Sequence, residues 1–415
     1  MKLFQKLLIA PALLGLFSPI AATANELNID DVTGYSSSEE VESINDFNAA
    51  KELAVTNSRV DALEAEFNNF EAGTFSDTTS LTGSASFQIG AVDQSGVTEK
   101  TTATYSYDLD LNTSFTGEDN LYVGIETGNY TASTADFVTN NSGGASDILK
   151  VTSAFYTFPF YGAEMAVGPL LDNDDLMPTA TSRYSDKFFM SSQAGGMTSS
   201  NFNWEMGVTG AGVAIAKNFD NGFNASASVL GISSSTTSGF LTKEGTDVTT
   251  LSVGYDKDNY GFGLVYVISD DVCTFISDYD STCASSNFTK VPVDTTTIGG
   301  YWSPFEGTTL SANYGIMAAE LSGYSFEDLT KWHLGVDQEL GNGVLSAAVT
   351  GNDYFSVSGW KVNADYLGEF AEIYYTYDVN DSIEVVSGIS WAVGDRNGTY
   401  WIDRTALGTE VTFKF

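Results

Sequence analysis

From residue 78 onward, apolar and polar side chains alternate along the chain with a period of two. Leu310, Ala312, Tyr314 and Ile316, for example, are separated by small or polar residues. The same alternation recurs in segments 105–111, 260–268, 331–340, 360–366, 383–393 and 406–415. A strand of this kind has one apolar and one polar face. Many such strands in succession predict an all-β fold, in particular a transmembrane antiparallel β-barrel.

The connections between these segments alternate between short and long. The short ones contain the Asn, Asp and Gly that tight hairpin turns need, and they fall at 117–120, 220–222, 257–259 and 341–343. The long ones fall at 129–147, 170–204, 233–247 and 270–293. Short turns on one rim and long loops on the other are typical of bacterial barrels, so we expect about 16 strands within residues 76–415. The alternative is a soluble β-sandwich or propeller, whose sheets would share an apolar core.

The first 45 residues have a different pattern. Residues 1–24 combine Lys2 and Lys6, a short apolar run, and small residues at Ala22 and Ala24, which together predict a secretory signal peptide. The alternative is a membrane anchor, but the apolar run is shorter than the roughly 20 residues that span a bilayer. Residues 25–45 are polar and acidic, and we expect them to be extended.

Residues 46–72 change to a helical pattern. Apolar side chains between Leu53 and Phe70 recur at spacings of three and four, with charged residues between them. This spacing predicts a short N-terminal α-helix with a narrow apolar stripe, which needs a partner surface. Two interpretations remain open. The helix forms a parallel coiled coil, trimeric if the barrel is trimeric, or it lies on the body of the protein or plugs its mouth.

Acidic residues outnumber basic residues throughout the chain. There are 17 Lys and Arg against 54 Asp and Glu, a formal net charge of −37. Because contacts with phosphate need Lys and Arg, this balance excludes electrostatic binding of nucleic acid. No segment after the first 24 residues offers the roughly 18 consecutive apolar residues of a transmembrane helix. An exported chain of this kind is therefore either soluble or a closed barrel.

Residues suited to catalysis or metal binding are scarce. His333 is the only histidine, so sites built on paired histidines are excluded, and no Ser-His-Asp order is visible. We therefore expect no catalytic residues, no cofactor and no metal. Cys273 and Cys283 are predicted to form a disulfide that closes a small external loop, since an exported protein encounters an oxidising compartment.

The last residues form one more alternating segment. Val411, Phe413 and Phe415 alternate with Thr412 and Lys414, and the chain stops on an aromatic residue. This ending is similar to the assembly signal of outer-membrane barrel proteins. We therefore expect the barrel-assembly machinery and outer-membrane lipid as partners.

Four N-terminal stretches carry a resemblance to a known family. The runs KELAV at 51–55, SRVDALEA at 58–65 and FSDTTSLTG at 75–83, together with ELNIDDV at 26–32, resemble cyanobacterial porins of the carbohydrate-selective porin family. The resemblance implies an outer-membrane homotrimer through which small solutes and inorganic ions diffuse passively. One departure is clear: no room remains for the S-layer-homology domain with which that family grips the cell wall. The resemblance therefore does not imply that this chain attaches to the cell wall.

Strand parity then predicts which charged side chains face the lumen. The pore-lining candidates are Asp108, Asp110, Asp256, Lys331, His333, Asp337, Glu339, Lys361, Asp365, Glu384, Arg404 and Glu410, and Lys414 shares their parity. Carboxylates are in excess among them, and rings of carboxylates favour cations, so we expect a weak cation preference. The alternative is that these acids are merely solvated and that loops near the constriction decide selectivity.

The long connection at 170–204 is the best candidate for a loop folded into the channel. It carries both signs of charge close together, at Asp172, Asp174, Asp175, Arg183, Asp186 and Lys187. The alternative is an external loop that covers the rim. Residues 172–175 also offer clustered oxygens to a divalent cation, although they lack the spacing of a known calcium site.

Three functions are consistent with these patterns. The first is a passive, cation-preferring channel. The second is a structural envelope protein, with the barrel as its anchor and residues 46–72 as a spacer. The third is a specific channel for carbohydrates or organic acids.

Overall fold

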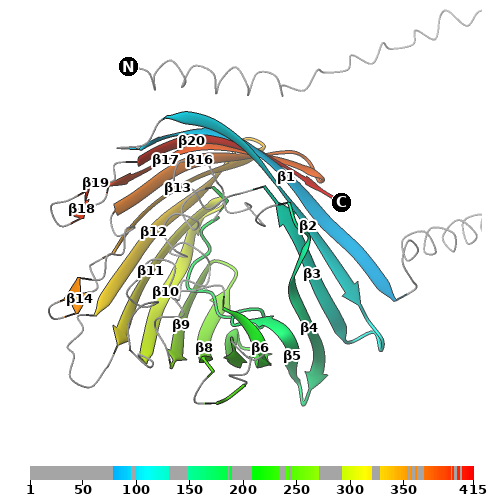
Figure 1. Cartoon of the computed structure of the whole chain (residues 1–415). Helices are drawn as coiled ribbons and strands as arrows, with labels where there is room; N and C mark the ends of the chain where they lie inside the picture. Colours follow the sequence, from blue (N-terminus) through cyan, green and yellow to red (C-terminus); the bar gives the residue numbers. More distant parts are fainter. Residues whose placement is uncertain are drawn as a thin grey trace, which may run out of the picture. The chain divides into compact units, whose positions relative to one another are not determined.

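Sixteen antiparallel strands close into one barrel in the computed structural model (Figure 1). The prediction of an all-β barrel of about 16 strands is confirmed. The structure describes residues 78–94, 99–129, 147–185, 187–188, 208–232, 240–242, 245–270, 292–319, 328–352, 356–357, 360–361, 369–393, 395–396, 400–401 and 404–415. The expected signal peptide, extended segment and helix all lie outside these residues and stay predictions.

The barrel strands follow one another around the ring in chain order. They are β1 (Thr79–Gln94), β2 (Lys100–Thr113), β3 (Asn120–Gly128), β4 (Lys150–Phe160), β5 (Ala163–Asp172), β6 (Thr209–Asn218), β7 (Phe223–Gly231), β8 (Asp247–Lys257), β9 (Tyr260–Ser269), β10 (Val293–Phe305), β11 (Thr308–Ala319), β12 (Leu329–Leu340), β13 (Gly343–Asn352), β16 (Glu369–Asn380), β17 (Ile383–Val393) and β20 (Arg404–Lys414). Two small separate sheets pair β14 (Ser356–Val357) with β15 (Trp360–Lys361), and β18 (Asp395–Arg396) with β19 (Tyr400–Trp401).

The ring is closed by the first and last strands of the barrel. β1 pairs with β20 from Ser84, opposite Lys414, to Gln94, opposite Arg404. Beyond that register, the backbone groups of Gly83 and Phe415 exchange two hydrogen bonds of 2.9 and 3.0 Å. Closure leaves no unpaired sheet edge, which is the condition for strands to cross hydrocarbon.

Short and long connections lie on opposite rims, as the sequence predicts. Every second connection, from β2–β3 to β16–β17, is a short turn, whereas those on the other rim are longer, apart from residues 95–99 between β1 and β2. Gly222 and Gly341 adopt φ values of +94° and +64°, which L-residues with side chains rarely adopt. These two positions explain why glycine ends the turn predicted at 220–222 and begins the turn predicted at 341–343.

On most strands, polar side chains face the lumen and large apolar side chains face outward. On β12, Trp332 and Leu334 are exposed on the outside, whereas Lys331 and His333 point inward and are buried. Phe87 and Ile89 on β1 and Phe262 and Leu264 on β9 are exposed in the same way. An apolar outer face and a polar interior are the arrangement that a lipid environment requires.

One expected barrel strand is wrong. The alternation at 360–366 predicts a strand of the barrel wall, but Trp360–Lys361 pairs with Ser356–Val357 in a separate two-stranded sheet between β13 and β16. Alternation is a local property and does not determine which strand becomes the partner. Lys361 is therefore not part of the barrel wall. No helix long and apolar enough to cross a membrane occurs among the described residues.

Candidate functional site

The connection that follows β5 runs along the inside of the barrel wall (Figure 1). Its described part, residues 173–185 and 187–188, is called the inner loop here. It starts against β7 and β8: the Asn173 amide donates to the Thr250 hydroxyl over 3.3 Å, and the Ser228 hydroxyl donates to the Asn173 carbonyl over 3.0 Å. Both wall residues face the lumen, so the loop enters the barrel directly after its strand.

The middle of the inner loop crosses β7 to β11. The Thr179 hydroxyl lies 2.8 Å from the side-chain oxygen of Asn224 and 2.8 Å from that of Ser252. Further along, the backbone N–H of Arg183 donates to the hydroxyl of Ser311 over 3.0 Å. The chain thus finds lumen-facing hydrogen-bond partners on successive strands, and these satisfy polar groups that folding inside the barrel would otherwise leave buried without partners.

The end of the inner loop is held by β12, β16 and β17. The Tyr184 hydroxyl donates to Glu372 over 2.8 Å, and the Ser185 N–H donates to Asp337 over 3.0 Å. The Lys187 ammonium lies 2.6 Å from Glu384, which also accepts from Lys414 over 3.3 Å. Burial, together with the nearby Glu372, raises the pKa of Tyr184 well above its ordinary value, so its hydroxyl remains a donor.

A small apolar core inside the barrel fixes this end of the loop. Tyr184 and Phe188 are buried with Tyr374, and Val92, Ala348, Val386 and Ala406 complete the cluster. The Phe188 and Tyr374 rings stack at 5.7 Å, and the Tyr184 ring lies 5.2 Å from the His333 ring. Aromatic burial of this kind stabilises the loop by hydrophobic transfer and by ring packing.

Several predicted pore-lining residues face inward but are buried beneath other side chains. His333 and Glu410 are completely buried, and Lys331, Arg404, Glu384 and Asp337 are nearly so. Their direction agrees with strand parity, but their burial removes them from direct contact with an open channel. They therefore belong to the packing between the wall and the segments folded against it.

A different set of carboxylates remains half-exposed to the lumen on β2 and β3. Asp108 lies directly opposite Glu126 in the β2–β3 register, and Asp110 follows two residues later. Ser84 donates to Asp108 over 3.2 Å, and the Tyr122 hydroxyl donates to Asp110 over 2.6 Å. Hydrogen-bonded carboxylates so close together place a negative potential on this face of the channel.

Arg183 is one of two partly exposed basic side chains of the inner loop, the other being Lys187. Its guanidinium lies 3.0 Å from Asp256 and 4.1 Å from the centre of the Tyr301 ring, whose hydroxyl also donates to Asp256. Arg183 and Asp256 are 42% and 43% exposed, so water reaches this pair. Both signs of charge are thus available at the loop.

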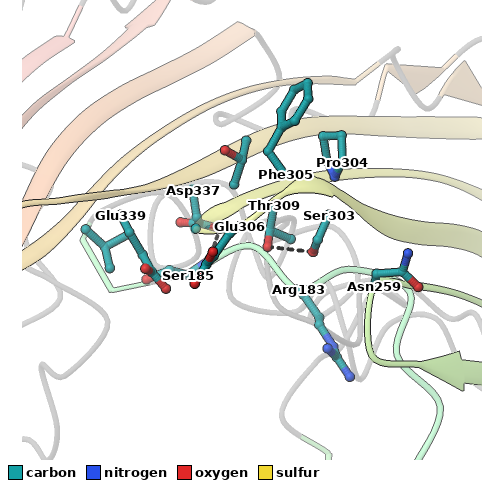
Figure 2. A pocket seen from close by; sticks show the side chains of 13 residues that line it. Arg183, Ser185, Asn259, Ser303, Pro304, Phe305, Glu306, Thr309, Asp337 and Glu339 are labelled. Carbon is teal, nitrogen blue, oxygen red and sulfur yellow. Dashed lines mark hydrogen bonds between the residues drawn. The ribbon is translucent and has the colours of Figure 1, made fainter.

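A hollow of about 490 Å³ lies beside Arg183, near the short-turn rim. Figure 2 shows Glu339, Glu306, Asp337 and Ser185 gathered on one side of it, with Arg183 and Asn259 on the other. Ser303 and Thr309 lie 3.0 Å apart between them. Three of its lining side chains are carboxylates, Glu306, Asp337 and Glu339, and one is a cation, Arg183.

The acidic turn at 172–175 joins β5 to the inner loop. The Asp172 N–H donates to Asp175 over 2.7 Å, and the Asn173 N–H donates to Asp172 over 2.7 Å. Desolvation inside the barrel, aided by Asp174, raises the pKa of Asp175 to about 6, although part of its side chain is exposed. Within the described ranges, no group of three or more His, Cys, Asp or Glu side chains is placed to hold a metal ion.

Four of the singled-out residues have no described placement, namely Asp186, Asp365, Cys273 and Cys283. The predicted disulfide therefore stays a prediction. Lys361 is a correction, because its strand belongs to a separate two-stranded sheet and not to the wall of the pore. The remaining candidates lie on lumen-facing positions or on the inner loop, where Arg183 meets Asp256 and Lys187 meets Glu384.

Sequence reasoning missed part of the site. Glu126 and Glu372 lie on lumen-facing positions of β3 and β16, and the same parity argument would have found them. Tyr184 and Phe188, which fix the loop, lie in a segment without periodicity, so no sequence pattern distinguishes them from exposed loop aromatics.

The comparisons with known proteins agree with this geometry. No protein-family model matches the chain. An uncharacterized protein of Nostoc sp. is 26% identical over 414 residues, which covers 88% of this chain and 70% of the relative. Nostoc is a cyanobacterium, so this relative agrees with the resemblance noted in the sequence but adds no function.

Solved outer-membrane porins share the fold at low sequence identity. OprB of Pseudomonas putida superposes with a TM-score of 0.55 at 12% identity, covering 81% of this chain and 94% of its own. An anion-selective porin from Comamonas acidovorans gives 0.55 at 13% identity, and OmpT of Vibrio cholerae in its trimer form gives 0.54 at 11%; each covers 81% of this chain and 99% of its own. The chain therefore has the fold of outer-membrane porins.

Proposed function

We propose that this chain is an outer-membrane porin, a water-filled channel through which small solutes and inorganic ions diffuse passively, with a preference for cations. The inner loop supports this proposal most directly. It is bound along the lumen wall from β7 to β17, inside a closed barrel whose outer face is apolar. A loop held against the wall narrows a channel without closing it.

The cation preference is supported by the charges that remain exposed to the lumen. Asp108, Asp110 and Glu126 are half-exposed on β2 and β3, whereas Arg183 is paired with Asp256. Buried charges such as Lys331 do not contact a permeating ion, whereas the exposed carboxylates do. The exposed balance is therefore negative, which favours cations.

The shared fold does not decide ion selectivity. One of the similar structures is an anion-selective porin, so a barrel of this architecture accommodates either preference. The preference of this chain must therefore come from its own side chains, and its acidic lumen is the relevant observation.

Planar-bilayer recording tests the proposal. Purified protein, reconstituted in a planar bilayer between unequal KCl concentrations, is expected to give stepwise increases of current. Its reversal potential should have the sign of a cation-selective channel. A reversal potential on the anion-selective side would overturn the cation preference but not the channel. The absence of any conductance from a folded barrel would leave only a structural envelope role. Liposome swelling in sugars compared with salts separates a general channel from a carbohydrate-selective one.

Trimeric assembly and outer-membrane targeting complete the proposal. The OmpT neighbour has a trimer form, and the last strand of this barrel, β20, closes it against β1. We expect a homotrimer that is inserted by the barrel-assembly machinery. Light scattering of the detergent-purified protein should give three times the protomer mass, and a monomer mass would contradict the trimer.

A further inference from the structure

We propose that glycines on the lumen faces of β8, β9, β10 and β12 form a seat for the inner loop and thereby set the width of the channel. The seat consists of Gly254, Gly263, Gly299 and Gly335. This inference rests on the proposed channel function and adds to it the residues that fix the pore cross-section.

Three of these glycines form one continuous row across the wall. Gly254 on β8 lies directly opposite Gly263 on β9, and Gly263 lies directly opposite Gly299 on β10. Gly335 follows on β12, opposite Ser311 of β11, which accepts the Arg183 N–H. The absence of side chains along this row leaves a shallow groove in a wall that otherwise carries polar side chains.

The inner loop fills this groove so closely that no methyl group would fit beneath it. A Cβ atom at Gly263 would lie 2.5 Å from the Thr179 methyl carbon and 2.9 Å from the Ala180 carbonyl oxygen. A Cβ atom at Gly254 would lie 2.9 Å from the same Thr179 methyl carbon. Carbon atoms pack best at about 3.5–4.0 Å, so an alanine at Gly263 would displace the loop by about 1 Å.

The other end of the groove is filled in the same way. A Cβ atom at Gly299 would lie 2.3 Å from the carbonyl oxygen of Thr181, and one at Gly335 would lie 2.6 Å from the Tyr184 ring. The contacts occur in the order of the loop sequence, from Thr179 through Thr181 to Tyr184. The groove and the loop therefore match along their length.

Polar contacts fix the loop over the groove. The Thr179 hydroxyl lies 2.8 Å from side-chain oxygens of both Asn224 and Ser252, on the two strands β7 and β8 beside the glycine row. A loop that is pinned at Thr179 cannot slide along the wall to escape a new side chain. It must move inward, toward the opposite wall, and this movement narrows the channel.

Gly263→Ala is the most selective substitution for testing the seat. The three atoms nearest to its Cβ position all belong to Thr179 and Ala180 of the loop, whereas a Cβ atom at Gly299 would also meet Asn313 of the wall. We expect Gly263→Ala to lower the single-channel conductance in planar bilayers and Gly263→Val to lower it further. The largest neutral polyethylene glycol that enters the pore should shrink in parallel.

Gly124→Ala provides the matched control. Gly124 faces the lumen on β3, and a Cβ atom there would lie 3.2 to 3.4 Å from its nearest neighbours, Tyr122, Ser153 and Thr152, with no inner-loop atom among them. The same methyl group is thus added to the lumen without touching the loop. Its conductance should stay close to that of the wild type. Heat-modifiable migration on gels verifies that each variant folds.

A double variant tests whether Thr179 transmits the effect. Thr179→Ser removes the methyl carbon that lies 2.5 Å from the Gly263 Cβ position and keeps the hydroxyl that faces Asn224 and Ser252. In the Gly263→Ala background, Thr179→Ser should restore part of the lost conductance, because the Ala180 carbonyl contact remains. Comparison with the Thr179→Ser single variant isolates the coupling between the two residues.

The outcomes distinguish failure of the proposed glycine seat from failure of the proposed channel function. A folded Gly263→Ala protein with the wild-type conductance and exclusion size would overturn the seat, whereas a wild-type barrel without conductance would overturn the proposed function. If Gly263→Ala does not fold, Thr179→Ala leaves the wall intact and removes both polar contacts. Its open-channel current should then fluctuate more than that of the wild type, and a current as steady as the wild type's would contradict the seat.

Discussion

Two parts of the barrel wall have the same sequence pattern and different surroundings. On β12 and β16, lumen-facing His333 and Glu372 are at most 1% exposed, because the end of the inner loop packs near them. On β2 and β3, lumen-facing Asp108, Asp110 and Glu126 are half-exposed. These parts are called the covered wall and the open wall. In both, polar side chains alternate with apolar ones that face outward.

The comparison teaches that facing the lumen and contacting the permeating solute are different properties. Two carboxylates of the covered wall find hydrogen-bond partners in the inner loop, Asp337 in Ser185 and Glu372 in Tyr184. Polar groups of the open wall keep water and ions as partners. The first set therefore determines the position of the loop, and the second set determines the field in the channel.

The largest expected effect comes from the covered wall. Tyr184→Ala removes a buried ring and its hydrogen bond to Glu372, so we expect the free energy of unfolding to fall by about 3–5 kcal/mol. Urea unfolding in lipid vesicles measures this change. Tyr122→Ala on the open wall is the matched control, since its ring is half-buried and its hydroxyl also donates to a carboxylate. Equal losses of unfolding free energy in the two variants would show that the covered wall does not contribute more to stability than the open wall.

The sequence predicts which side chains face the lumen, but it does not predict which of them the inner loop covers. Alternation correctly places Asp108 and Glu384 on the lumen side, because side-chain direction follows from strand period alone. It fails for Trp360–Lys361, which alternate but pair outside the barrel. It also cannot distinguish covered from open positions. That difference depends on Tyr184 and Phe188, which lie far from their partners in sequence and follow no period.

The second effect concerns the charges of the open wall. The triple variant Asp108→Asn, Asp110→Asn and Glu126→Gln removes three half-exposed carboxylates, and we expect the reversal potential to shift strongly toward zero or to the anion-selective side. The shift should be larger in dilute salt, because the screening length is about 30 Å at 0.01 M but only about 3 Å at 1 M.

Glu410→Gln provides the control from the buried set. Glu410 faces the lumen but is completely buried, and it accepts from Thr412 over 3.0 Å. Its substitution should leave the reversal potential nearly unchanged. A shift as large as one third of that of the triple variant would mean that buried and half-exposed carboxylates contribute alike.

A smaller effect is expected from pH. The pKa of Asp175 is raised to about 6, so lowering the pH from 7.5 to 5 neutralises this carboxylate and should weaken the cation preference. Because its pKa is higher in the folded state, folding is also favoured as the pH falls through 6. Asp175→Asn should reduce both responses in titrations of the reversal potential and of unfolding.

Asp119→Asn is the corresponding control. Hydrogen bonds from Tyr156 and from the Thr116 backbone hold the pKa of Asp119 well below its ordinary value, so it stays ionised from pH 5 to 7.5. The pH dependence of this variant should match that of the wild type. A pH response that persists unchanged in Asp175→Asn would assign it to another group.

The smallest effect on stability is expected where the inner loop meets the channel. Arg183 and Asp256 are bonded at 3.0 Å but almost half-exposed, and exposed ion pairs contribute about 0–1 kcal/mol to folding. Arg183→Gln should therefore change the free energy of unfolding by less than about 1 kcal/mol. It should still increase the cation preference, because it removes a positive charge and leaves Asp256 without its ion-pair partner. Asp256→Asn should have the opposite effect on selectivity and an equally small effect on stability. If the two variants shift the reversal potential in the same direction, the pair acts on the position of the loop and not through its charge.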